Sequence, residues 1–246
     1  MAFYFVSDVH AGLKLDGVPT RGKERLIDWL DKVAADAEGI FLLGDIFDFW
    51  FEYRHAVPTG HELLLAKFQE LTARGIAIHF FPGNHDMWTL DYLSRDCGLT
   101  VHTKGFYTEL CRKKIYMEHG DLQSIGSFSE RFMQGCFRSR FIQWVGRTFV
   151  SYRRMMRFGT NWSHSNRAKH DREHVFKAEQ EGVVQFAREY LKKHEVNLFI
   201  FGHLHCPQEY RLSENTMLYV LGDWILERPA RYGRLDESGF SLLSWI

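Results

Sequence analysis

The stretch Phe41–Trp50, FLLGDIFDFW, decides the fold that this sequence predicts. It continues an apolar run that begins at Ile40, and that run is too short for a helix and lies between Gly39 and Gly44. A run of this kind predicts a buried strand. Gly44 then allows the backbone to turn and places Asp45 at the carboxyl end of the strand. Because ligands bind at that edge of an open α/β sheet, Asp45 is a candidate functional residue.

Other apolar runs predict an alternation of strands and helices along the chain. Runs short enough for buried strands lie at 2–6, 76–81 and 196–201. Segments with apolar residues at helical spacing lie at 23–37, 61–74 and 175–193. The successive strand–helix repeats predict a largely parallel sheet with crossover helices. Further strands are predicted at 108–111, 114–117, 208–212, 217–221 and 240–245, the last three in a second sheet.

Length and composition indicate one globular domain over residues 1–246. The 31 basic and 31 acidic residues balance, so the net charge indicates no particular partner, and we expect no nucleic acid. The four cysteines form no Cys-x-x-Cys pair, which predicts free thiols in a reducing cytosol. We expect a cytoplasmic protein, because Asp8 and His10 come too early for a signal peptide and no apolar run approaches the length of a membrane span.

Acids, histidines and an asparagine follow the ends of several predicted strands. These motifs are Asp8-Val-His10, Gly44-Asp45, Gly83-Asn84-His85-Asp86, Glu118-His119-Gly120-Asp121 and Gly202-His203-Leu204-His205. Residues two apart on an extended strand share a face, so we expect Asp8 and His10 to point the same way. Together the motifs predict that the acids and histidines converge on Asp45, which bridges two metal ions. Carboxylate, imidazole and amide donors without a thiolate favour Mn, with Fe or Zn as alternatives.

Within Gly83–Asp86 the three polar residues suit three different roles. Asn84 offers a neutral carbonyl oxygen to a metal ion. His85 then faces the substrate as an acid or as an electrostatic clamp, and Asp86 is expected to orient the His85 ring.

The segment 122–175 differs from the rest of the chain. It has ten basic residues and three acids, with many aromatic residues between them and no proline. Apolar residues recur at three and four positions, which predicts a helical insertion. One interpretation is a packed helical hairpin with solvated arginines. The other is a lid that holds an anionic, partly apolar substrate or lies on anionic lipid.

The order of these motifs from Asp8 to His205 resembles the calcineurin-like metallophosphoesterase superfamily. The resemblance implies an α/β (α+β) fold in which two packed β-sheets are flanked by helices, an αββα sandwich, with a helical lid insertion. It also implies two divalent metal ions. The ligands that it implies for one ion are Asp8, His10, Asp45 and His205. Those that it implies for the other are Asp45, Asn84, His119 and His203.

Within the superfamily the chain resembles the UDP-2,3-diacylglucosamine hydrolases of lipid A synthesis. The stretches Leu43–Trp50 and His119–Asp121 match that subfamily, as does the position of the insertion. The implied reaction cleaves the diphosphate of a UDP-linked lipid to UMP and 2,3-diacylglucosamine 1-phosphate. The implied location is the inner face of the inner membrane of a Gram-negative-type bacterium, with the protein peripheral on an anionic surface. The implied substrate contacts are Asn84, His85, Ser163, Asn166, Arg167, Lys169 and His203.

The chain departs from that subfamily at three places. After His119–Asp121, where an acidic and threonine-containing segment is expected, it has Leu122-Gln-Ser-Ile-Gly126. His85 stands where well-known members have arginine, and this histidine is the general superfamily form. In the segment 162–169 only Asn166 and Lys169 keep the Asn-x-x-Lys spacing of the subfamily.

Two other functions therefore stay open. The first is a phosphoesterase that acts on a nucleotide, a cyclic nucleotide or a phosphoprotein; His85 favours it, whereas the basic and aromatic insertion argues against a small polar substrate. The second is a non-catalytic binding scaffold on the same fold, which would have lost metal ligands that this chain retains.

Overall fold

A computed structural model of the chain describes residues 1–246 except 54–55, 125–127, 160, 162–173 and 226–228, and for 128–131 and 133 it describes the backbone alone. Its first sheet has six strands in the order β13-β12-β1-β4-β5-β6. The strands β1, β4, β5 and β6 pair in parallel, whereas β12 and β13 are antiparallel. The six strands are β1 (Ala2–Val6), β4 (Ala37–Leu43), β5 (Ala77–Phe81), β6 (Thr100–Val101), β12 (Ala230–Asp236) and β13 (Gly239–Trp245).

The second sheet has five strands in the order β10-β11-β9-β8-β7. Its central strands β8, β9 and β11 are parallel, and β7 and β10 close its two edges as antiparallel partners. The strands are β7 (Phe106–Leu110), β8 (Lys113–Glu118), β9 (Leu198–Phe201), β10 (Gln208–Ser213) and β11 (Thr216–Val220). A small hairpin, β2 (Lys14–Leu15) with β3 (Val18–Pro19), projects after β1.

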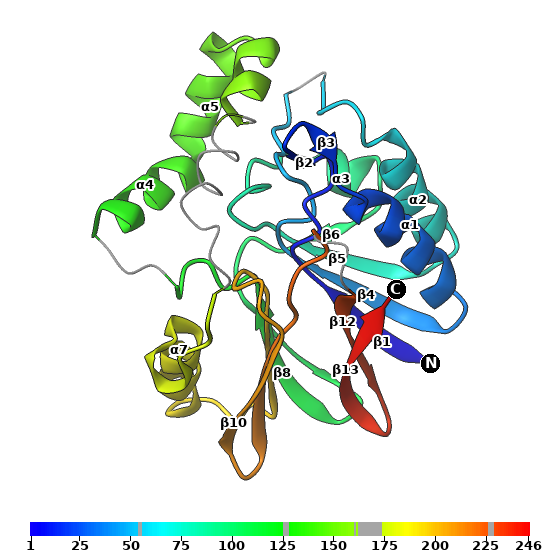
Figure 1. Cartoon of the computed structure of the whole chain (residues 1–246), viewed down its shortest axis with the longest axis vertical. Coiled ribbons are helices and arrows are strands. Elements are labelled where there is room, and N and C mark those ends of the chain that lie inside the picture. The colour runs from blue at the N-terminus through cyan, green and yellow to red at the C-terminus, as the bar shows by residue number, and fades with distance from the viewer. Residues whose placement is uncertain (54–55, 125–127, 160, 162–173, 226–228) are drawn as a thin grey trace.

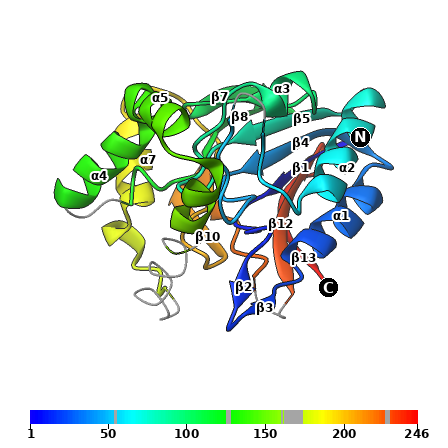
Figure 2. The ribbon, with the colours of Figure 1, turned by 90° about the horizontal axis from the view of Figure 1, so that it is seen from above.

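Helices cover the outer faces of the two sheets, so the layers run helix, sheet, sheet, helix (Figures 1 and 2). On the first sheet lie α1 (Gly22–Val33) and α2 (Glu62–Ala73), followed by the short α3 (Tyr92–Arg95). On the second sheet lies α7 (Gly182–Leu191), which follows the 3-10 turn η1 (Ala178–Gln180). The predicted fold class is confirmed.

Three apolar clusters hold these layers together. Between the sheets, Phe5, Phe41 and Phe81 of the first pack against Ile115 and Ile200 of the second. The other two clusters lie between each sheet and its helices. Burial of such side chains contributes about 1.5–3 kcal/mol each, so the seam between the sheets is firmly packed and can position loops from both sheets.

Two strand and helix predictions are corrected. The segment 240–245 was expected in the second sheet, but β13 pairs with β12 in the first, because β12 lies between β1 and β13. A single helix was expected over 175–193, but α7 begins only at Gly182. Ala178 has a left-handed backbone (φ 50°) that interrupts the helix, and the Glu181 carboxylate accepts a hydrogen bond from the Lys177 N–H at 2.7 Å.

The described part of the segment 122–175 is mainly helical, as the spacing predicts. Its helices are α4 (Phe128–Arg138), α5 (Arg140–Phe149) and a further helix over 152–159. In Figure 1, α4 and α5 stand outside the layers, above α7. Among the described residues, no helix is both long enough and apolar enough to span a bilayer.

Candidate metal centre

The predicted ligands lie in loops that follow strands of both sheets. Asp8, Asp45 and Asn84 follow β1, β4 and β5, whereas His119 and His203 follow β8 and β9. Backbone hydrogen bonds join these loops: the Asp8 N–H donates to the Gly44 carbonyl at 3.0 Å, and the Gly202 N–H donates to the His119 carbonyl at 2.9 Å. The site therefore forms where the carboxyl ends of the two parallel strand sets meet.

Five of the predicted ligands have a left-handed backbone, with φ between 49° and 68°. They are Asp8, His10, Asp45, His203 and His205. Residues other than glycine seldom adopt this conformation, and such strain concentrates at functional sites. The expectation that Asp8 and His10 lie on an extended strand is wrong. Their backbone turns instead, because the His10 N–H donates to the Asp45 carbonyl at 2.9 Å.

Two glycines are required by close approach. A Cβ atom at Gly44 would lie 2.4 Å from Nδ1 of His119, and one at Gly83 would lie 2.2 Å from Oδ1 of Asp45. Both distances are shorter than any real carbon contact. The Gly44 and Gly83 turns thus allow two candidate ligands to reach the site.

The predicted ligands form two neighbouring groups, and in each the candidate donor atoms lie within 4.8 Å of one another. The first group is Asp8, His10 and His205, and the second is Asp45, His119 and His203. Oδ2 of Asp45 lies 3.8 Å from Nε2 of His10 and 3.4 Å from Nε2 of His119. One carboxylate oxygen of Asp45 therefore faces both groups.

Asn84 belongs with the second group. Its Oδ1 atom lies 3.3 Å from Nε2 of His119. The structure thus brings together all seven residues that the sequence proposes as ligands.

The outward ring nitrogens of three histidines face oxygen atoms. Nδ1 of His119 donates to the Leu43 carbonyl at 2.9 Å, which leaves Nε2 as the donor atom for a metal ion. Nδ1 of His205 lies 3.6 Å from the Asp223 carboxylate, and Nδ1 of His10 lies 3.5 Å from that of Asp48. Such partners set the tautomer and the orientation of a ligating imidazole.

Asp48 and Asp223 were missed as site residues. A signal for Asp223 is present, because Gly222-Asp223 follows β11 as Gly44-Asp45 follows β4. Asp48 lies three residues after Asp45 in the stretch that decides the fold, but aromatic neighbours surround it there and indicate a core segment.

The charges of the site favour a cation. Burial would raise the pKa of Asp45, yet the imidazoles of His119 and His85 outweigh it and hold that pKa well below its usual range. Burial lowers the pKa of His119, but Asp45 and Asp8 raise it more, to about 10. Burial, with His119 nearby, lowers the pKa of His203 to about 3, so its ring is neutral and available as a ligand.

The residues fit divalent metal ions. Oδ1 of Asp8 is buried, and no hydrogen-bond donor reaches it among the described residues. Burial raises the pKa of this carboxyl group, which shows how poorly the pocket solvates its charge. A buried acceptor beside gathered imidazoles is the arrangement that a bound cation would stabilise.

Asp86 does not orient the His85 ring as expected. Its two oxygen atoms accept hydrogen bonds from the backbone N–H groups of Gly83, Asp45, Ile46 and Phe47, at 2.7–3.3 Å. The buried Asp86 carboxylate therefore holds the turn that carries Asp45. Nδ1 of His85 instead lies 2.9 Å from the Asp48 carbonyl, and this contact orients the ring. The His85 N–H donates to Oδ1 of Asp45 at 2.8 Å.

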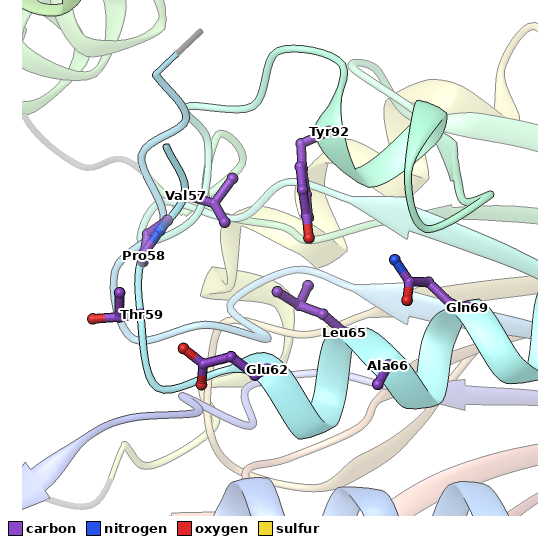
Figure 3. Close-up of a pocket in the computed structure, with 8 residues that line it drawn as sticks. All are labelled: Val57, Pro58, Thr59, Glu62, Leu65, Ala66, Gln69 and Tyr92. Carbon is purple, nitrogen blue, oxygen red and sulfur yellow. The ribbon is translucent and has the colours of Figure 1, made fainter. Parts of the chain in front are cut away.

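The substrate contacts predicted at Ser163, Asn166, Arg167 and Lys169 lie outside the described residues. A cavity of about 200 Å³ lies away from the ligands, between the loop 57–59 and α2 (Figure 3). Its lining includes Leu65, Ala66 and Tyr92, and none of the candidate metal ligands. It is not the candidate active site.

Comparison with known proteins agrees with this geometry. Residues 1–207 match the model of the calcineurin-like phosphoesterase family, so the chain belongs to this family. It is a hydrolase of a metal-dependent class, and the gathered aspartates and histidines are groups that could hold the divalent ions.

Individual relatives show a more specific similarity than the family as a whole. The chain is 35% identical over 236 residues to a UDP-2,3-diacylglucosamine hydrolase from Porphyromonas gingivalis, with 90% of each chain covered. It is 30% identical to a protein of the same name from Haemophilus influenzae, with 96% of this chain and 95% of that one covered. Among solved structures, an archaeal phosphodiesterase shares the fold, with a TM-score of 0.54, 12% identity and 99% of each chain covered.

Proposed function

We propose that this chain hydrolyses the diphosphate of UDP-2,3-diacylglucosamine and releases UMP and 2,3-diacylglucosamine 1-phosphate, a step of lipid A synthesis. The likeness to the P. gingivalis hydrolase supports this proposal most strongly. It spans 90% of this chain, and the remaining tenth is shorter than the insertion 122–175. The likeness therefore extends into the insertion and is not confined to the metal-binding loops. In this proposal residues 1–246 form one metallophosphoesterase domain that includes the insertion.

The metal ligands that we propose follow the two observed groups. Asp8, His10 and His205 hold one ion, Asn84, His119 and His203 hold the other, and Asp45 is shared. Mn suits these oxygen and nitrogen donors, with Fe or Zn as alternatives. When bound, the two ions supply positive charge for the attacked phosphoryl group and activate the attacking water.

His85 is the group that we assign to the leaving oxygen. Its Nδ1 atom contacts the Asp48 carbonyl at 2.9 Å, and in this proposal Nε2 is the ring nitrogen that faces the substrate. An imidazole can hold or donate a proton at a leaving oxygen. Asn84 precedes His85 in the chain, and His203 belongs to the second ligand group with Asp45 and His119. Both residues contact the phosphate in this proposal. Further contacts to the lipid headgroup are proposed for Ser163, Asn166, Arg167 and Lys169.

The insertion is proposed to contact acyl chains and an anionic membrane surface, which makes the protein peripheral on the inner membrane. Its described helices expose Phe141, Trp144 and Phe149, at 69%, 55% and 73% of their surface. Exposed Arg140 and Arg153 lie close to them in the chain. Aromatic residues beside arginines suit the boundary between acyl chains and anionic headgroups.

The decisive experiment compares turnover of UDP-2,3-diacylglucosamine with turnover of bis(4-nitrophenyl) phosphate. We expect a far higher kcat/KM for the lipid substrate, with UMP as a product. A higher kcat/KM for the aryl phosphodiester would instead indicate a phosphoesterase for another substrate. Metal analysis of protein purified without added metal tests the scaffold alternative. A non-catalytic scaffold would contain no bound metal and would hydrolyse neither compound.

A further inference from the structure

One arginine of helix α5 joins the helix to the body of the protein. Nε of Arg147 donates to the Glu52 carbonyl at 2.7 Å, and Nη2 lies 3.3 Å from the carbonyls of both Trp88 and Thr89. The guanidinium also lies over the Phe51 ring, 5.5 Å from its centre. This one side chain thus contacts two separate loops, 50–53 and 84–90.

Gly146 allows the helix to approach these loops closely. A Cβ atom at this buried glycine would lie 3.3 Å from Cε of Met155, 3.4 Å from the Trp88 ring and 3.6 Å from the Phe51 ring. Phe51, Trp88 and Met155 form a small apolar cluster of their own. The arginine therefore sits at the edge of a packed contact and not on an open surface.

The two loops that Arg147 joins are also those that fix His85. The Trp50 N–H donates to the His85 carbonyl at 3.2 Å, and the Glu52 N–H donates to the Trp88 carbonyl at 3.0 Å. Asp48 precedes the first loop, and its carbonyl is the 2.9 Å contact of the His85 ring. The relative placement of the loops thus sets the direction of the imidazole.

The Glu52 carboxylate is engaged elsewhere in this junction. It accepts hydrogen bonds from Nε1 of Trp50 at 2.9 Å and from the N–H groups of Leu90 and Tyr92. The hydrogen bonds that Arg147 makes with described residues all go to backbone carbonyls. A side chain that joins three carbonyls of two loops holds their spacing, and an uncharged or shorter side chain could not join all three.

We propose that Arg147 is a positioning residue for phosphoester hydrolysis, which connects the insertion to the catalytic loop and keeps the His85 ring aimed at the metal centre. This proposal rests on the role of His85 given under the proposed function, but not on the lipid substrate. The insertion then does more than bind the acyl chains, because its docking helps to set the position of the catalytic His85 ring.

The test uses bis(4-nitrophenyl) phosphate, which is too small to need the acyl-binding part of the insertion. For Arg147→Met we expect kcat to fall about tenfold with KM little changed, since small misplacements of a catalytic group cost rate. Arg147→Lys should restore part of the rate, because its ammonium still reaches one carbonyl. Metal content and the circular dichroism spectrum should match those of the unmodified protein. The control is Arg74→Met, an exposed arginine at the end of α2 that bonds Ala34 and Glu70.

A double variant separates positioning from general destabilisation. His85→Ala alone should lower kcat by about a hundredfold, and adding Arg147→Met should lower it no further, because Arg147 acts through the missing ring. If Arg147→Met lowers kcat as much in the His85→Ala variant as it does in the unmodified protein, the proposal is overturned. The proposal is also overturned if Arg147→Met leaves kcat unchanged and raises only the KM for the lipid substrate. Arg147 would then serve only to hold the part of the insertion that binds the acyl chains.

Should Arg147→Met fail to fold, Arg147→Lys carries the same comparison. Failure of the protein to hydrolyse the lipid would refute the proposed substrate and leave this test intact.

Discussion

Nε2 of His119 lies 3.4 Å from Oδ2 of Asp45, although the two residues follow strands of different sheets. Nδ1 of the same ring donates to the Leu43 carbonyl, one residue before the Gly44 turn. His119 thus crosses from β8 to the end of β4, and Gly44 leaves room for its ring. The metal centre is consequently built across the seam between the sheets. Its geometry depends on the packing of that seam.

The shared position of Asp45 gives the first prediction. Asp45→Ala should remove bound metal and lower turnover by more than about a hundredfold. Mutation of a residue that only hydrogen-bonds to a metal ligand typically lowers activity by up to about a hundredfold, so loss of a ligand itself should cost more. Metal analysis and turnover of bis(4-nitrophenyl) phosphate measure both effects on the same sample. Asp91→Ala, a 65% exposed carboxylate before α3, is the control. A variant at Asp45 with full metal content and full activity would show that the carboxylate is not shared.

The buried His61 gives a prediction about pH. Burial, with a smaller contribution from Lys23, lowers its pKa from 6.5 to about 4. The unfolded chain therefore binds a proton below pH 6.5, whereas the folded chain does so only near pH 4. This histidine contributes stability that is complete above pH 6.5 and is lost as the pH falls toward 4. Between pH 7 and 4.5 the loss is about 2–3 kcal/mol, at about 1.4 kcal/mol for each pH unit.

Urea unfolding with a chelator at both pH values measures this loss. His61→Gln has no titrating ring at this position. Between pH 7 and 4.5 the loss in its free energy of unfolding should therefore be smaller than the loss in the unmodified protein, by about 2–3 kcal/mol. Equal losses in the two proteins would mean that the folded state accommodates the charged ring.

The strand ends of the site could be predicted from sequence, because each is an apolar run followed by glycine or a polar group. The backbone of the ligands could not be predicted. Asp8 and Asp45 adopt left-handed conformations that local propensity disfavours, and only tertiary hydrogen bonds such as that from Asp8 to Gly44 hold them. β12 was also missed, since its buried positions alternate with Arg231 and Arg234 and include Gly233, which weakens the strand signal.

Roles that depend on contacts far apart in sequence were predicted less well. The adjacent Asp86 was expected to orient His85, but the contact comes from Asp48, 37 residues away in the chain. Sequence proximity suggested one partner, and the packing of the β4 and β5 loops selected another.

The exposed aromatic residues of α5 give a prediction about membranes. The protein should bind vesicles that contain anionic lipid, and binding should weaken as salt screens the arginines. Trp144→Ala should lower the partition coefficient by about tenfold or more, because burying a large apolar side chain in the interface contributes about 1.5–3 kcal/mol. Leu63→Ala is the control, since Leu63 is 74% exposed on α2, outside the insertion. Absence of binding at low salt would leave the insertion as a substrate lid or as plain structure.

The choice between the two phosphorus atoms of the diphosphate gives the last prediction. Arg147 docks the insertion directly on the loops 50–53 and 84–90, the second of which carries His85. The acyl chains bound by the insertion would therefore lie on the His85 side of the centre. The glucosamine 1-phosphate is then the group that departs toward His85. Water must attack from the opposite side, as in-line displacement requires, and therefore reaches the phosphorus nearer the uridine.

Hydrolysis in oxygen-18 water tests this orientation directly, with mass spectrometry of both products. The label should appear in UMP and not in 2,3-diacylglucosamine 1-phosphate. Lipid phosphate incubated alone in the labelled water is the control for exchange without turnover. Label in the lipid phosphate of the reaction would mean that the substrate lies reversed. The uridine, and not the acylated sugar, would then lie on the side of His85, and acyl binding by the insertion would be refuted with it.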